Sequence, residues 1–237
     1  MDGFARMTKS IRVLGKLGIV ACSAFALQVI PSADQSALAE QQEPTEKQKK
    51  STLEFLHQGA KPNFLPIEDD RGVITFEIRL NSKVTWAILD TGSGNTIMDV
   101  GLAKRIGLTV RDQETSIKTT FGQTRKSKTS EATLTVPGQF TVSGEFNAAK
   151  LDQVSMVMGK EIGLILGLDI LRHLGYLVDS KNGRLIFAAG GAINVNRPGA
   201  SIVAMNEGVI SGSIDGKPAS FEIDLGSNSA VLLLAKS

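Results

Sequence analysis

The sequence predicts a mainly β protein with one or two short helices, and three observations support this fold class. Short apolar or alternating segments recur from residue 72 onward. Turn-forming pairs such as Asn81-Ser82 and Pro137-Gly138 separate these segments, and the helical patterns between them are brief. The 237 residues include 24 glycines and only 5% aromatic residues, a composition typical of a globular protein with room for one large or two modest domains.

The N-terminal segment, residues 1–39, has the pattern of a secretory signal peptide. A basic stretch ends at Lys16, residues 17–30 are mostly apolar, and Ala37-Leu38-Ala39 forms a small-x-small cleavage pattern. As a helix the apolar stretch spans roughly 21 Å, short of the roughly 30 Å hydrocarbon core of a membrane. We therefore expect export to the periplasm or beyond, without stable membrane insertion after cleavage. A loose lipoprotein-type box that ends at Cys22 leaves a lipid anchor as the alternative.

Charge and cysteine content exclude several classes of function. Cys22 is the only cysteine, so the mature chain is expected to have no disulfide, no thiol nucleophile and no cysteine metal site. Much of the net charge of +2 comes from residues 1–39, and the remainder is balanced, which argues against a nucleic-acid partner. No motif calls for a metal or a cofactor.

Residues 40–66 are predominantly polar and are interpreted as a solvated linker, with one helical turn around residues 53–56. A pro-segment that covers a cleft is the alternative. The predicted main lobe, residues 67–190, begins with strands over 73–80 and 84–89 that are joined by a turn. Asp99 then caps a short helix that ends at Gly107.

The second half of this lobe continues the β pattern. Strands are predicted over 132–136 and 140–142, and the apolar run 162–167 is typical of a strand buried on both faces. Asp169 is predicted to cap a short helix over 170–174. A hairpin follows, with strands over 176–179 and 184–187.

Residues 191–237 are predicted to form a partial second lobe. When the sequence around Asp224 is aligned with that around Asp90, Gly226 matches Gly92 and Ser227 matches Ser93. The strand–turn–strand pattern over 210–223 matches the strands before Asp90, which indicates an internal repeat. Because few residues follow Asp224 in this sequence, we expect the second lobe to be incomplete.

The segment Asp90-Thr91-Gly92-Ser93 follows directly after the apolar run 84–89. Burying a carboxylate at the end of a strand costs free energy unless a partner compensates its charge, so such a group usually has a partner or a function. Asp90 is therefore the leading candidate for a catalytic residue, and Asp224 is its possible counterpart.

These features resemble the retropepsin-like aspartic peptidases, the single-lobe relatives of pepsin. In that family an Asp-Thr/Ser-Gly turn is backed by a later apolar-apolar-Gly segment, which corresponds here to Ile165-Leu166-Gly167. The resemblance covers about residues 72–189 and implies a closed β-barrel lobe that hydrolyses peptide bonds. Two carboxylates about 3 Å apart share one proton and activate a water molecule, so neither metal nor cofactor is needed.

The resemblance also implies roles for the other residues of the turn. Gly92 would let backbone N–H groups approach the carboxylate, Thr91 would hydrogen-bond across the lobe interface, and Ser93 would bond the outer oxygen of Asp90. A flap hairpin is expected to close over a peptide substrate, with Phe121-Gly122-Gln123 as the candidate tip.

Three hypotheses remain for the second carboxylate and the activity. The favoured one is a homodimer that pairs Asp90 with Asp90 of a second chain. The second pairs Asp90 with Asp224 within one chain of a two-lobed parent, although Leu225 replaces the expected threonine or serine. The third is a catalytically inactive lobe that binds peptides or partner chains by strand addition.

Overall fold

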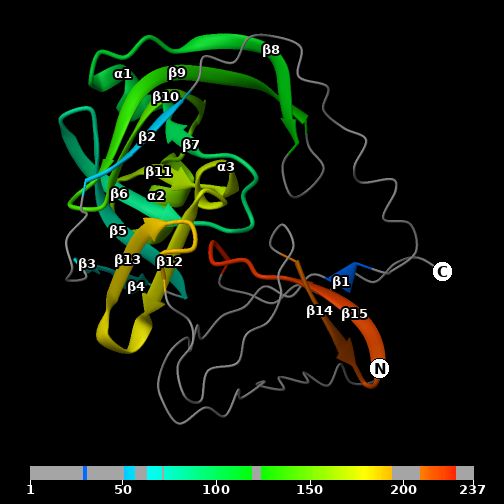
Figure 1. The fold of residues 1–237 in the computed structure, drawn as a ribbon. Coiled ribbons are helices and arrows are strands. Elements are labelled where there is room, and N and C mark those ends of the chain that lie inside the picture. Colours follow the sequence, from blue (N-terminus) through cyan, green and yellow to red (C-terminus); the bar gives the residue numbers. More distant parts are fainter. Residues whose placement is uncertain are drawn as a thin grey trace.

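The computed structural model describes residues 29–30, 51–56, 63–70, 72–118, 124–193 and 209–227. Its main body is a closed barrel of six strands (Figure 1). In ring order the strands are β10 (Phe140–Ala149), β7 (Ile97–Asp99), β11 (Ile162–Leu166), β6 (Lys83–Leu89), β5 (Val73–Leu80) and β9 (Thr124–Val136), which pairs again with β10. The predicted mainly β fold with a closed barrel is confirmed.

Further strands extend the barrel at its edges. β2 (Thr52–Phe55) pairs with β10, β4 (Glu68–Asp70) with β5, and β8 (Arg111–Lys118) with β9. A separate sheet contains β3 (Leu65–Pro66), β12 (Leu174–Asp179) and β13 (Arg184–Ala189), with the 3-10 helix η1 (Ser180–Asn182) between the last two. This confirms the predicted hairpin, whose connection is held by hydrogen bonds from Asn182 and Arg184 to the Asp179 carboxylate.

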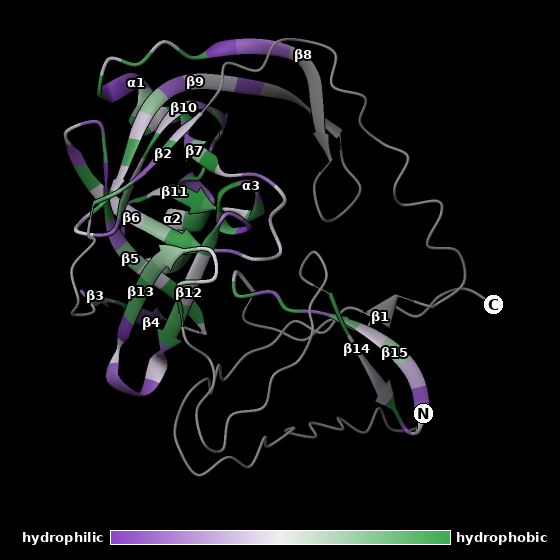
Figure 2. Cartoon of the chain, in the orientation of Figure 1, coloured by the Kyte–Doolittle hydropathy of each residue, from purple (hydrophilic) through white to green (hydrophobic). Residues whose placement is uncertain are grey.

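The barrel interior is apolar because alternate residues of each strand point inward. Figure 2 shows the apolar residues along β7 and β11, in contrast to the hydrophilic connection between β12 and β13. β11 lies between β6 and β7, and all of its residues except Ile165 are buried, which confirms the prediction that this run is buried on both faces. The largest side chains with almost no exposed surface are Phe76, Phe140, Ile74, Ile78, Leu80, Leu89, Met98, Leu102, Leu134, Ile162, Leu164 and Leu166.

The helical turn predicted around residues 53–56 is wrong, because residues 52–55 form strand β2. Leu53 and Phe55 pack against the core, whereas Thr52 and Glu54 are exposed. This alternation has the period of a strand, and pairing with β10 decides the conformation of a short segment that has little helical preference of its own. The segment interpreted as a linker thus contributes β2 and β3 to the fold.

Three short α-helices lie outside the barrel strands. α1 (Val100–Arg105) begins as predicted at Asp99, whose carboxylate accepts a hydrogen bond from the Leu102 N–H. α3 (Leu168–Leu171) follows β11, but its N-cap is Gly167, so the prediction that Asp169 caps it is wrong. α2 (Asp152–Met158) has no counterpart among the predicted elements. None of the helices in the described part of the chain is long and apolar enough to span a membrane.

Strands β14 (Val209–Ile214) and β15 (Lys217–Glu222) form a hairpin beside the barrel (Figure 1). At its turn Ile214 pairs with Lys217, and at the turn between β5 and β6 Leu80 pairs with Lys83. The left-handed residue in each connection also matches, with φ of 52° at Asn81 and 50° at Asp215. β1 (Val29–Ile30), from the segment interpreted as a signal peptide, pairs with β15.

Candidate active site

Asp90 emerges from the barrel at the end of β6. Its backbone N–H donates to the Leu166 carbonyl at 3.1 Å, so β11 fixes the point at which the chain leaves the sheet. The Asp90 Oδ1 atom accepts hydrogen bonds from the N–H groups of Gly92 and Ser93, both at 2.9 Å. The turn thus presents the carboxylate in a fixed orientation, as the sequence predicts for Gly92.

Asp224 lies in a second turn of the same construction, after β15. The Asp224 Oδ1 atom accepts from the Gly226 N–H at 2.8 Å, as Asp90 does from Gly92. The two turns face each other: a Cβ on Gly92 would lie 2.5 Å from the Asp224 Cγ, and one on Gly226 would lie 2.2 Å from the Asp90 Cγ. Each glycine therefore makes room for the carboxyl group of the opposite turn.

Thr91 joins the two turns. Its buried Oγ1 donates to the Ile223 carbonyl at 2.5 Å and accepts from the Leu225 N–H at 2.9 Å. The predicted contact across the lobe interface is therefore present, between segments far apart in the sequence. Leu225 has no hydroxyl to return this contact, and its side chain is buried in the main apolar core instead.

The proximity of Asp224 perturbs the ionisation of Asp90. Burial, and then the negative charge of Asp224, raise the pKa of Asp90 from 3.8 to about 6, against the opposing effect of the two backbone N–H donors. Burial and the charge of Asp224 also raise the pKa of Glu222. The Asp90 carboxyl group therefore keeps its proton to a higher pH than an ordinary aspartate does.

The segment behind the Asp90 turn packs closely against it. A Cβ on Gly167 would lie 2.5 Å from the Asn95 carbonyl carbon, and the Leu168 N–H donates to the Ser93 carbonyl at 2.8 Å. The role predicted for Ile165-Leu166-Gly167 as a supporting segment thus agrees with the contacts of Leu166 and Gly167.

Thr96 and Asp169 form a link to this segment that the sequence reasoning missed. The Asp169 Oδ1 atom accepts from the Thr96 N–H at 2.8 Å and from the Thr96 hydroxyl at 2.6 Å, while the Gly167 N–H donates to that hydroxyl at 3.1 Å. Thr96 has no exposed surface. The sequence shows Thr96 shortly after Thr91. It does not show that Thr96 contacts Asp169, which lies far along the chain.

The role predicted for the Ser93 hydroxyl is wrong. It donates to the Asn95 carbonyl at 2.7 Å, and the backbone N–H of Ser93 contacts Asp90 instead. A serine hydroxyl in a turn rotates readily to a carbonyl two residues further along the chain.

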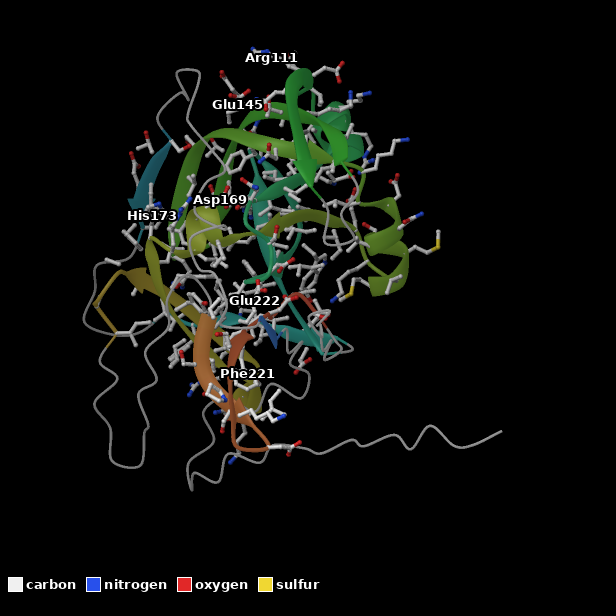
Figure 3. All side chains as sticks on the ribbon, turned by 90° about the vertical axis from the view of Figure 1, so that its right-hand side faces the viewer. Arg111, Glu145, Asp169, His173, Phe221 and Glu222 are labelled. Atoms are coloured by element: carbon white, nitrogen blue, oxygen red, sulfur yellow. The ribbon has the colours of Figure 1, made fainter. Side chains whose placement is uncertain are left out.

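The flap candidate Phe121-Gly122-Gln123 lies outside the described residues. The flanking strands β8 and β9 pair in antiparallel fashion. Figure 3 shows Asp169 on the barrel lobe, and Phe221 and Glu222 on the β14–β15 hairpin.

Residues 76–170 match a family model described as aspartyl protease. No curated protein sequence matches the chain. Among solved structures, the EIAV protease complexed with the inhibitor HBY-793 is 19% identical, covers 49% of this chain and 90% of its own, and has a TM-score of 0.32.

Two further solved structures are similar to parts of this chain. A retropepsin-like aspartic protease from Rickettsia conorii is 15% identical and covers 60% of this chain and 98% of its own, with a TM-score of 0.38. The retroviral protease-like domain of Ddi1 from Leishmania major is 20% identical and covers 56% and 100%, with a TM-score of 0.30.

Proposed function

We propose that the chain is an aspartic endopeptidase whose catalytic pair is Asp90 and Asp224 of the same molecule; residues 76–170 match the family model described as aspartyl protease. The family resemblance seen in the sequence is thereby confirmed. The observation that carries the proposal is the mutual approach of the two turns, in which Gly92 faces the carboxyl group of Asp224 and Gly226 faces that of Asp90.

The chemistry follows from two carboxyl groups that share one proton. The ionised carboxylate acts as general base and removes a proton from a water molecule, while the protonated partner donates a hydrogen bond to the scissile carbonyl. Water attacks the carbonyl carbon, and the proton taken up by the pair is returned to the leaving amine. The backbone N–H groups of Gly92, Ser93 and Gly226 hold the two carboxyl groups in position for this exchange.

Substitution of each aspartate tests the proposal. Asp90→Asn and Asp224→Asn should each lower kcat/KM on unfolded protein or peptide substrates by at least about 10³-fold, because neither variant can share a proton between two carboxyl groups. The measurement is peptide cleavage followed by mass spectrometry between pH 4 and 7.

The same two variants separate the alternatives. A homodimer that pairs two copies of Asp90 predicts that Asp224→Asn remains active, whereas the proposed pair predicts that it does not. If wild-type protein binds peptides but cleaves none, and Asp90→Asn binds them equally well, the chain is a peptide-binding module.

We also propose that the chain is exported, on the basis of the pattern in residues 1–39. Processing after Ala39 would yield a mature protein that begins at Glu40. N-terminal sequencing of the protein from fractionated cells tests this, and a product that retains residues 1–39 in the cytosol would contradict it. Lipid modification of Cys22 would place the start of the mature chain at that residue instead.

A further inference from the structure

Glu222 occupies a distinctive position relative to the proposed catalytic pair. It lies two residues before Asp224, as Ile88 lies two residues before Asp90, and the two positions correspond in the matched hairpins. Because side chains alternate along a strand, residues two apart point to the same side. Glu222 and Ile88 therefore lie on the sides of their strands from which the two aspartates emerge.

The residues adjacent in sequence to Glu222 and Ile88 point the other way. The ring of Phe221 covers Gly212, where an added Cβ would lie 2.5 Å from the ring, and Leu89 is buried in the barrel core. Glu222 is thus turned away from the apolar face of its hairpin.

The two corresponding positions offer opposite chemistry. Ile88 is apolar, is paired with Ile165 of β11, and is itself buried in a cluster of apolar side chains. Glu222 is only partly buried, and its pKa is raised by burial and by the nearby charge of Asp224. Within the described residues its carboxyl group has neither a hydrogen bond nor a basic partner, so a cation placed beside it would relieve an unfavourable charge.

A substrate bound as an extended strand at the proposed catalytic pair would meet the side of β15 from which Asp224 emerges. Its successive side chains point to opposite sides, so one of the two residues that flank the scissile bond is directed to that hairpin. From this geometry we propose that Glu222 selects a lysine or arginine on one side of the scissile bond. This inference rests on the proposed function and adds a substrate class to it.

Cleavage of matched peptides tests the proposal. A series that differs only at one flanking position, with Lys, Met or Glu there, is compared by kcat/KM for wild type and variants. For wild type, kcat/KM should be at least about tenfold higher for the Lys peptide than for the Met peptide and lowest for the Glu peptide. The reason is that the Glu222 carboxylate attracts a positive side chain and repels a negative one. The advantage of Lys should shrink at high ionic strength.

Glu222→Gln should bring the Lys-to-Met ratio of kcat/KM close to one. Glu222→Lys should reverse the preference in favour of the Glu peptide. The matched control is Glu54→Gln, an exposed glutamate on β2, a strand that pairs with β10. This control should retain the wild-type ratio.

Peptide binding to Asp90→Asn gives a readout that does not depend on catalysis. The Lys peptide should bind this variant at least about tenfold more tightly than the Met peptide, and Asp90→Asn combined with Glu222→Gln should lose the difference. Equal binding of the two peptides, or a Lys-to-Met ratio unchanged by Glu222→Gln, would overturn the inference. Selective binding without any cleavage would support it and would instead contradict the proposed enzymatic activity.

Discussion

At the scale of single residues, the burial of Asp90 lowers the stability of the fold and also shifts its pKa toward the range that acid–base catalysis needs. Burial and the charge of Asp224 both oppose its ionisation, and the backbone N–H groups of Gly92 and Ser93 offset only part of that opposition. The raised pKa of about 6 means that the ionised form of Asp90 lowers the stability of the folded state, and this loss is the cost of holding the two carboxyl groups together.

The first prediction concerns the pH dependence of stability. Because the pKa of Asp90 is raised from 3.8 to about 6 on folding, the folded state holds more protons than the unfolded state between these values. The free energy of unfolding should therefore fall as the pH rises from about 4 to 6. Asp90→Asn should remove this dependence on pH. Its free energy of unfolding at pH 7 should exceed that of wild type by on the order of 2–3 kcal/mol.

Urea denaturation at four pH values between 4 and 7 measures this difference. Asp69→Asn, at an exposed position of β4, serves as the control and should keep the wild-type slope. Parallel pH profiles for Asp90→Asn and wild type would show that the carboxyl group of Asp90 is not perturbed by folding.

The second prediction concerns the glycines that separate the two turns. Gly226→Ala would place a Cβ 2.2 Å from the Asp90 Cγ, so the turns must move apart. We expect kcat/KM to fall by at least about 10²-fold because the carboxyl groups lose their alignment. The pKa of Asp90, followed by NMR, should fall as the charge of Asp224 moves away.

Gly94→Ala is the matched control for this experiment. A Cβ at Gly94 meets no atom within 4 Å, so activity and the pKa of Asp90 should stay close to wild type. Equal activity of the two alanine variants would contradict the close approach of the turns.

At the scale of elements, the β14–β15 hairpin is held to the barrel at the Asp90 turn. Thr91 contributes both a donor and an acceptor to residues that flank Asp224, and Leu225 adds apolar burial. The catalytic geometry therefore depends on the hairpin remaining docked, and Thr91 couples docking to the orientation of the turn.

Thr91→Val should loosen the hairpin, because a buried N–H group and a carbonyl lose their partner at a cost of about 1–3 kcal/mol. Hydrogen exchange of the amides in residues 209–222 should become faster, while amides of β5 and β6 should change little. Thr91→Ser keeps the hydroxyl and should exchange like wild type. Slow exchange in the valine variant would show that the docking does not depend on this hydroxyl.

At the scale of the whole molecule, the proposed catalytic pair within one chain has consequences for assembly. The place opposite Asp90 is filled by Asp224 of the same chain, so a second copy is not needed to complete the pair. The activity of a monomer is independent of dilution, whereas a pair formed between chains is lost below the dissociation constant of the dimer.

Specific activity should therefore stay constant as the protein is diluted about 100-fold through the range in which sedimentation detects any dimer. Mixing Asp90→Asn with Asp224→Asn should restore no activity, since each chain still lacks one carboxyl group. Loss of specific activity on dilution, together with dissociation of a dimer, would support the pairing of Asp90 between two chains that the sequence first favoured.

Local patterns in the sequence were sufficient for β5, β6 and β11, for parts of β9 and β10, for helix α1 and for the Asp90 turn, but not for β7. Alternating and continuous apolar runs identified β5, β6 and β11, because the spacing of apolar residues along the sequence follows the spacing of buried side chains along a strand. The matched spacing around Asp224 identified the second turn. Those patterns could not identify β2, whose conformation depends on pairing with β10, or the contact between Thr96 and Asp169.

The sequence by itself determined that this protein carries one complete Asp-Thr-Gly turn with the apolar segment that supports it, and a second turn that resembles the first. Only the tertiary structure decided that the two turns meet. The physical reason is that each turn is specified by a few adjacent residues, whereas their meeting depends on how a hairpin distant in the sequence packs against the barrel. The hydroxyl of Thr91 and the space left by Gly92 and Gly226 make that packing possible, and both depend on neighbours from the other end of the chain.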